Sequence, residues 1–152
     1  MNHHSKETFD ELVIVGTAIL FFVAGYDTTS TTLAFALYEL SKNPEIQDRL
    51  REEVENISDG DTKKDLTYDN LNDMTYLDQI ICETLRFYNP TGMIQRTVTK
   101  EYTIPGSDII IPKDNNVWVN TVAIHFDPKH YFDPHVFNPD HFSKEAKAQR
   151  NP

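Results

Sequence analysis

The sequence predicts a mainly α-helical fold with a small antiparallel β-sheet, and three observations support this fold class. An unbroken helical pattern covers about residues 8–41, two more helical segments follow, and short β-forming segments separated by turn residues come after Pro90. With 152 residues the chain has the length of one ordinary domain. Its 39 % hydrophobic and 25 % charged residues are typical of folded proteins rather than disordered ones.

The first helix is expected to begin at the capping box Thr8–Glu11 and to end near Ser41, which gives about 33 residues or roughly 50 Å. Within it, Leu12–Gly25 is apolar except at Gly16 and Thr17. This run of 14 residues is shorter than the ~18 that indicate a membrane span, and a row of hydroxyl residues follows it. Because its middle is apolar on every side, we interpret it as a core helix enclosed by protein.

The second helix is expected to begin at Pro44, since proline suits the first turn. Spacings of four residues predict the outward ion pairs Arg49–Glu53 and Arg51–Glu55. Its predicted apolar stripe comprises Ile46, Leu50, Val54 and Ile57.

Thr67 is expected to cap a short helical turn. A third helix is expected to follow, capped by Thr75 with Asp78 and ending near Asn89–Pro90. The predicted buried face of this third helix comprises Leu77, Ile80, Ile81, Leu85 and Tyr88.

Four short strands are expected after these helices, and the segment from His125 onward is expected to be ordered loop. Pro105–Gly106 supplies the turn between the second and third strands. These elements are too few to enclose a helix that is apolar all round, so the sequence predicts part of a larger protein. The predicted strands are Met93–Val98, Glu101–Ile104, Asp108–Ile111 and Val117–Thr121.

Charge and cysteine content exclude some classes of function. Asp and Glu outnumber Lys and Arg by 24 to 14, giving a net charge of −10, so nucleic acid is not an expected partner. Cys82 is the only cysteine, and no internal disulfide is possible. Residues 1–10 are polar and contain no signal peptide.

The segment Ala24–Thr29 combines two small residues with Asp27, Thr28 and a second threonine inside the long helix. A threonine hydroxyl can bond a carbonyl one turn back and bend a helix, which would leave a groove for a small ligand lined by a hydroxyl and a carboxylate. The alternative is a helix-packing contact of small residues, with Asp27 bonded to a neighbour.

Glu83 and Arg86 are spaced to meet on the surface of the third helix, and helical phase alone favours a solvated pair. Cys82, which directly precedes Glu83, lacks a glycine-rich loop around it and is interpreted as a small hydrophobic residue. Four histidines interleave with aspartates near the C-terminus, but their spacings match no metal-ligand pattern, and we interpret them as loop residues. These histidines are His125, His130, His135 and His141.

Eleven short motifs in a fixed order give a more specific prediction than any one of them. They are Ala24–Thr29, Asn43–Pro44, Tyr76–Asp78, Glu83–Arg86, Asn89–Pro90, Gln95–Arg96, Tyr102–Gly106, Ile111–Lys113, His125–Pro128, Asp133–Pro134 and Phe137–Phe142. In this order and spacing the chain, over residues 8–152, resembles the cytochrome P450 family, most closely animal microsomal members.

The resemblance implies a heme-dependent monooxygenase that inserts one atom of dioxygen into a small lipophilic organic substrate. Heme b would be held by an axial cysteine thiolate, a flavoprotein reductase would supply electrons, and the complete protein would lie at the cytosolic face of the endoplasmic reticulum membrane. Residues 1–152 would form a partial P450 domain that stops before the heme-ligand cysteine loop beyond Pro152, so the fragment is expected to be inactive.

The resemblance also implies roles for individual residues. Asp27 and Thr28 match the acid–alcohol pair that delivers protons during O–O cleavage, and Ala24 and Gly25 match the wall of the groove beside the heme. Arg96 matches the position that contacts a heme propionate.

Glu83 and Arg86 match a buried structural pair whose partner in the family is usually an arginine at the position of His141. Histidine can still donate a hydrogen bond, but its charge depends on pH. Two other function classes stay open at this point: a catalytically inactive binding or scaffold module with the same architecture, and a histidine/aspartate metal-binding module.

Overall fold

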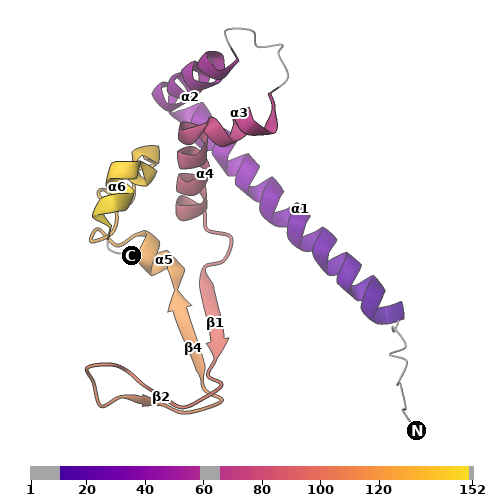
Figure 1. Ribbon diagram of the computed structural model, residues 1–152, viewed down its shortest axis with the longest axis vertical. Coiled ribbons are helices and arrows are strands. Elements are labelled where there is room, and N and C mark those ends of the chain that lie inside the picture. The colour runs from indigo at the N-terminus through magenta and orange to yellow at the C-terminus, as the bar shows by residue number, and fades with distance from the viewer. Residues whose placement is uncertain (1–10, 59–65, 151–152) are drawn as a thin grey trace.

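The computed structural model describes residues 11–58 and 66–150, so the predicted cap at Thr8 lies outside the described residues. Figure 1 shows most of the helices at one end of the molecule and the β-ribbons at the other, while the long N-terminal helix extends from the helical end to the level of the strands. The helices are α1 (Glu11–Lys42), α2 (Pro44–Ile57), α3 (Tyr68–Asp73), α4 (Thr75–Phe87), α5 (Thr121–His125), the 3-10 turn η1 (Pro139–Phe142) and α6 (Lys144–Gln149). The strands are β1 (Met93–Thr97), β2 (Tyr102–Thr103), β3 (Ile110–Ile111) and β4 (Asn116–Asn120). The mainly helical fold with a small antiparallel β component is therefore confirmed.

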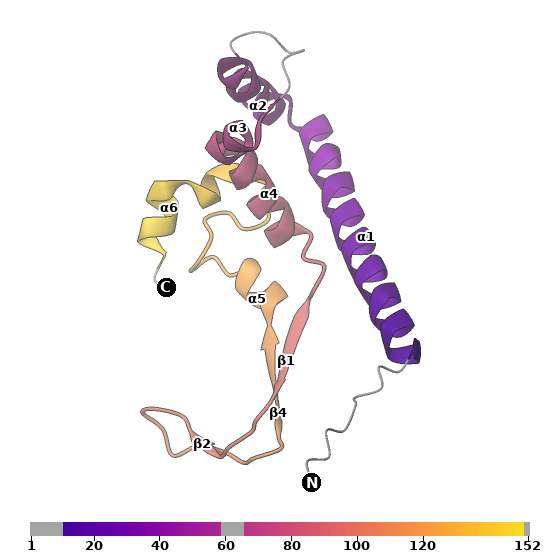
Figure 2. The same ribbon diagram turned by 45° about the vertical axis from the view of Figure 1, so that its right-hand side comes forward.

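Helix α1 is a continuous helix of 32 residues whose C-terminal part packs against α2 and α4. Its N-terminal half extends away from the other helices, as Figures 1 and 2 show. Residues 11–30 are all exposed in the described chain, so the elements present do not enclose the apolar run, as expected from their small number. By length and composition alone α1 could cross a membrane, because an 18-residue window within it has a mean hydropathy of 1.7, but core helices of soluble proteins meet the same criterion.

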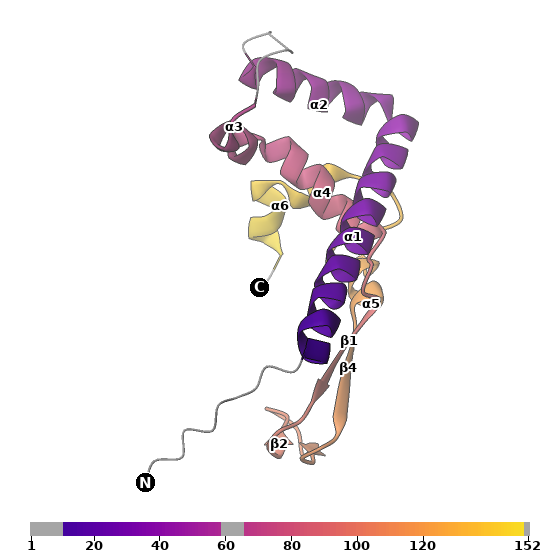
Figure 3. The ribbon, with the colours of Figure 1, turned by 90° about the vertical axis from the view of Figure 1, so that its right-hand side faces the viewer.

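The hydrophobic core lies where α2, α4 and the loop before η1 meet. Figure 3 shows α2 and α4 side by side at the C-terminal end of α1. Ile46, on the predicted stripe of α2, is buried in this core, which confirms the phase of that helix. The core side chains are Ile46, Tyr76, Ile80 and Phe137, with Leu40, Leu50 and Phe87 packed against them.

The ion pairs predicted on α2 are wrong. Arg49 Nη1 instead bonds Asp140 Oδ1 at 2.8 Å, and Arg51 pairs with Asp48 one turn back. Glu53 faces α4, where its carboxylate accepts the backbone N–H groups at the start of that helix.

Glu53 Oε1 accepts from Tyr76 N at 2.7 Å, and Oε2 accepts from Leu77 N at 2.9 Å. The predicted cap by Thr75 and Asp78 is therefore wrong, since α4 begins after Met74 without a local side-chain cap. A carboxylate from α2 satisfies these free N–H groups instead, and helix N-termini favour negative charge.

The buried face of α4 also differs from the predicted one. Ile80 is buried as expected, but Ile81 and Leu85 are 40 % and 38 % exposed. The buried positions are instead Tyr76, Ile80, Glu83, Thr84 and Arg86.

The four strands form two separate antiparallel ribbons rather than one sheet. Strand β1 pairs with β4, with Arg96 opposite Val117, and β2 pairs with β3. Gly106 takes φ 77° in the predicted turn, a conformation that glycine adopts without steric cost. The C-terminal segment predicted as loop contains η1 and α6, and Ser143 caps α6 by accepting from Ala146 N.

Candidate functional site

The acid–alcohol segment of α1 is exposed on the long helix. Thr28 Oγ1 donates to the carbonyl of Ala24 at 2.7 Å, which is the predicted bond one turn back. Among the described residues, no hydrogen-bond partner is found for the Asp27 carboxylate. Apart from Gly25 itself, its two chain neighbours and the nearby backbone of α1, no heavy atom lies within 4 Å of the place a Cβ of Gly25 would occupy. This part of α1 therefore presents a hydroxyl, a carboxylate and an open backbone surface.

A shallow, mostly apolar groove of about 350 Å³ lies between α1 and α4 and begins at Thr28. The α1 side of this groove carries Thr32, whose hydroxyl bonds the Thr28 carbonyl at 2.8 Å. The groove is lined by Thr28, Thr29, Thr32, Leu33, Ala36, Ile81, Leu85 and Pro90.

Glu83 and Arg86 form a buried ion pair on the opposite side of α4. Arg86 Nε and Nη2 donate to the two carboxylate oxygens of Glu83, both at 2.7 Å. The Arg86 and Glu83 side chains are 1 % and 0 % exposed. The burial that the family resemblance implies is confirmed, and the solvated pair that helical phase favours is wrong.

Backbone carbonyls from the last residue of α5 and from the segment after it accept from the remaining donors of Arg86. Its Nη1 donates to His125 O at 2.7 Å and to Pro134 O at 2.9 Å, and its Nη2 reaches Val136 O at 3.4 Å. All five N–H donors of the guanidinium therefore have acceptors, which is the condition for keeping such a charge buried.

The Glu83 carboxylate joins this pair to η1. Its Oε1 accepts from Asn138 N at 2.9 Å and lies 3.2 Å from His141 Nδ1. His141 Nε2 lies 2.5 Å from the Phe132 carbonyl. Both ring nitrogens of His141 therefore face oxygen atoms of the network.

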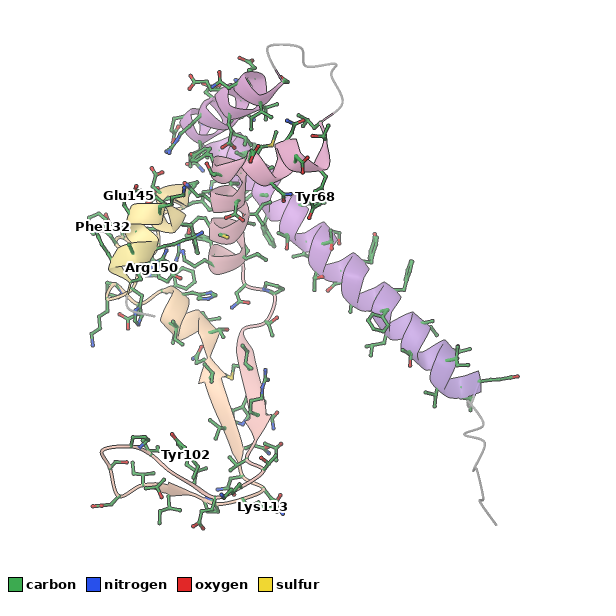
Figure 4. The ribbon with its side chains drawn as sticks, viewed as in Figure 1. Tyr68, Tyr102, Lys113, Phe132, Glu145 and Arg150 are labelled. Carbon is green, nitrogen blue, oxygen red and sulfur yellow. The ribbon has the colours of Figure 1, made fainter. Side chains whose placement is uncertain are left out.

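Aromatic rings and a second arginine enclose this network on the side of α6. Arg150, at the end of α6, donates to the His141 carbonyl, and its Cζ lies 4.6 Å from the centroid of the Tyr131 ring. The centroid of the same Tyr131 ring lies 5.0 Å from Arg86 Cζ. Figure 4 shows Arg150 and Phe132 in the region of α6, beside α4.

Arg96 lies apart from both groups, on β1. Its side chain is exposed, and Nη1 donates to the neighbouring Gln95 carbonyl at 2.8 Å. The structure thus brings Glu83, Arg86 and His141 together. Within residues 11–58 and 66–150, no hydrogen bond or ion pair joins Arg96 to the α1 residues.

Cys82 lies on α4 with its Sγ 3.9 Å from Asp78 Oδ1. Burial, reinforced by the Asp78 carboxylate, raises the pKa of this thiol above its usual value. The thiol form is therefore favoured over the thiolate that binds metals. In the part of the chain that is described, no group of three His, Cys, Asp or Glu side chains is arranged to hold a metal ion.

Sequence reasoning missed several members of the buried network. The carbonyls of Pro134 and Val136 and the amide of Asn138 are backbone groups, which carry no residue-type signal. The available signal was the cluster of Asp-Pro and Pro-Asp pairs in this segment, which predicts an ordered loop able to aim carbonyls at one point.

The fold and the buried ion-pair network point to one protein family, and sequence comparison identifies it. The profile of the family "Cytochrome P450" matches residues 1–152, and the chain belongs to this family of heme-dependent monooxygenases.

Three named relatives come from insects. Cytochrome P450 6B7 of Helicoverpa armigera is 44 % identical over 149 residues, which are 97 % of this chain and 29 % of that protein. Cytochrome P450 6l1 of Blattella germanica is 42 % identical over 91 % of this chain and 27 % of its own length. A probable cytochrome P450 6a13 of Drosophila melanogaster is 44 % identical over 91 % and 28 %. The chain thus spans less than a third of the length of these relatives.

Proposed function

We propose that this chain is the oxygen-activating and structural part of a longer heme-dependent monooxygenase that inserts one atom of dioxygen into a small lipophilic substrate. The observation that carries the proposal is the segment Ala24–Thr29 on α1, where the Thr28 hydroxyl and the Asp27 carboxylate are both exposed beside an open backbone surface. Membership of the cytochrome P450 family supports it.

The residues present are compatible with one side of a heme site. Ala24 and Gly25 offer a surface without bulky side chains, and Arg96 offers an exposed guanidinium suited to a propionate carboxylate. A thiolate-ligated heme, when bound, supplies the activation of dioxygen. Cys82 does not fit the thiolate role, because its pKa is raised by burial and by Asp78.

Asp27 and Thr28 would move protons in this reaction. The Thr28 hydroxyl donates its hydrogen to the Ala24 carbonyl, and the lone pairs on its oxygen can still accept a hydrogen bond from a water or from a bound substrate. The Asp27 carboxylate, one residue away, can take up and return a proton at the same exposed surface. A reductase would supply electrons, and the complete protein would lie at the endoplasmic reticulum membrane, as the family resemblance implies.

Two observations support the proposal that this chain works only within a longer protein. The chain covers less than a third of the length of its relatives, and the apolar run of α1 is exposed. Exposed apolar patches of this size mark surfaces that another part of a protein covers. We therefore expect the 152-residue chain alone to be inactive.

The test compares Thr28→Ala with Thr32→Ala in the complete protein. Both substitutions remove a hydroxyl bonded to a carbonyl one turn back on α1, so they perturb the helix alike. Thr28→Ala should keep the heme, while the product formed per electron donor consumed falls and the peroxide formed rises. The fall should be roughly 10-fold or more, since a positioned proton donor contributes about 10²–10⁴-fold. Equal coupling in the two variants would remove Thr28 from the proposed proton path.

A further inference from the structure

The most deeply buried position on α1 is an acid. Among the described residues of this helix only Glu39 is buried, with 2 % exposure. Most apolar side chains of α1 are exposed. Burying a carboxylate is unfavourable unless hydrogen bonds compensate, so such a position indicates a specific partner rather than general packing.

That partner is Tyr88, the residue that directly follows α4. Its hydroxyl donates to Glu39 Oε1 at 2.5 Å, and Lys42 Nζ lies 3.3 Å from the same oxygen. Asn43 Nδ2 donates to Glu39 Oε2 at 3.1 Å. Burial raises the pKa of the Tyr88 hydroxyl, and the Glu39 carboxylate raises it further, so the hydroxyl remains a donor.

A ring contact adds to this hydrogen bond. Tyr88 stacks on Phe35 of α1, with ring centroids 4.0 Å apart and planes within 5°. We call Glu39, Tyr88 and Phe35 the α1–α4 clamp. The clamp joins α1 to α4 through both a charge-assisted hydrogen bond and a stacked aromatic pair.

The position of the clamp along α1 connects it to Thr28. Thr28, Phe35 and Glu39 are separated by seven and four residues, a spacing that keeps side chains on one stripe of a helix. The stripe faces α4 along its length, because Thr28 lines the groove shared with α4 and Glu39 bonds Tyr88. Rotation of α1 about its axis would therefore move Glu39 and Thr28 together.

We propose that Glu39 and Tyr88 are positioning residues that fix the rotation of α1 on α4 and thereby the direction of the Thr28 hydroxyl. The inference rests on the proposed function, since the direction of this hydroxyl matters only if it handles protons. In this proposal the clamp acts through the orientation of α1.

The test uses Tyr88→Phe in the complete enzyme, with Tyr38→Phe as the matched control. Tyr88→Phe keeps the ring that stacks on Phe35 and removes only the hydroxyl, whereas Tyr38 is an exposed α1 residue. We expect Tyr88→Phe to keep its heme content and KM, while coupling of electron-donor consumption to product falls about 2- to 10-fold, as loss of one ordinary hydrogen bond would cause. Tyr38→Phe should match the wild type.

A double-mutant cycle separates positioning from a general loss of structure. If Glu39 and Tyr88 act through each other, the double variant Glu39→Gln/Tyr88→Phe should form at least as much product per electron donor consumed as the single variant that forms less. Unchanged coupling in Tyr88→Phe, or additive losses in the double variant, would overturn the inference.

Thr28→Ala, measured alongside Tyr88→Phe, distinguishes failure of the clamp from failure of the proposed function. Uncoupling by Thr28→Ala with normal coupling in Tyr88→Phe overturns the clamp and leaves the proposed function standing. Normal coupling in both variants overturns the role of Thr28 and the clamp with it.

Discussion

Glu83 and Arg86, three residues apart on α4, form a bidentate ion pair from which solvent is excluded, with both N–O distances at 2.7 Å. Through it, α4 holds the carbonyls of His125, Pro134 and Val136. Exposed ion pairs contribute about 0–1 kcal/mol, but removal of one member of a buried pair costs about 3–5 kcal/mol because the other charge is left without a partner. This network is therefore the principal polar link between α4 and the chain that follows α5.

Glu53 caps α4 from another helix, and its removal should destabilise the protein. Glu53→Ala leaves the N–H groups of Tyr76 and Leu77 without their acceptor, at a cost of about 1–2 kcal/mol, the magnitude of a lost helix cap. Glu55→Ala, on the exposed face of α2, is the control and should change stability by less than about 0.5 kcal/mol. The measurement is the urea midpoint of the complete protein, and equal midpoints for the two variants would contradict the capping role.

His125 should make the stability of this region depend on pH. Burial lowers the pKa of this histidine, and the Arg86 charge lowers it further, although the bond to the Arg86 carbonyl acts in the opposite direction. The pKa of His125 in the folded protein lies below its unfolded value of about 6.5. Its contribution to the free energy of unfolding is therefore fully present above pH ~6.5 and is lost as the pH falls through the folded pKa.

The comparison variant is His125→Gln, which cannot titrate in this range. The free energy of unfolding should fall more steeply between pH ~7.5 and ~5.5 in the wild type than in His125→Gln, whereas His130→Gln, at an exposed position, should follow the wild type. Parallel pH profiles for the wild type and His125→Gln would show that His125 does not contribute.

The 152-residue chain by itself should not give the carbon monoxide difference spectrum of a heme-thiolate protein. Its one cysteine, Cys82, has a raised pKa and is hydrogen-bonded to Asp78 within α4. A stoichiometric thiolate-type spectrum that disappears in Cys82→Ser would show that Cys82 has been misinterpreted.

Local signals in the sequence predicted most of the helix and turn positions. Pro44 begins α2, Thr67 caps α3 with Asn70, and Gly106 adopts the positive φ of its turn. Each of these depends on the preferences of a residue and its immediate neighbours, which a single sequence contains.

Features that depend on distant partners were not predictable from spacing. Arg49 bonds Asp140, 91 residues away, rather than Glu53 four residues away, because the free N–H groups of α4 already hold Glu53. Helical phase placed Glu83 and Arg86 on the surface because it counts apolar positions and cannot take account of distant partners. These include the His125 carbonyl, 39 residues after Arg86, and the Asn138 N–H, 55 residues after Glu83. The family resemblance predicted their burial because it carries information about that loop.

The heme content per polypeptide of Arg86→Ala and Arg51→Ala, produced side by side in the complete protein, shows whether heme binding depends on the Glu83–Arg86 pair. Arg51 is the matched control, because its pair with Asp48 is exposed and also joins residues three apart on a helix. The buried network predicts that Arg86→Ala yields little or no heme-loaded protein, while Arg51→Ala retains the wild-type content. Equal heme content in the two variants would contradict the claim that the Glu83–Arg86 pair holds this fold in its heme-binding form.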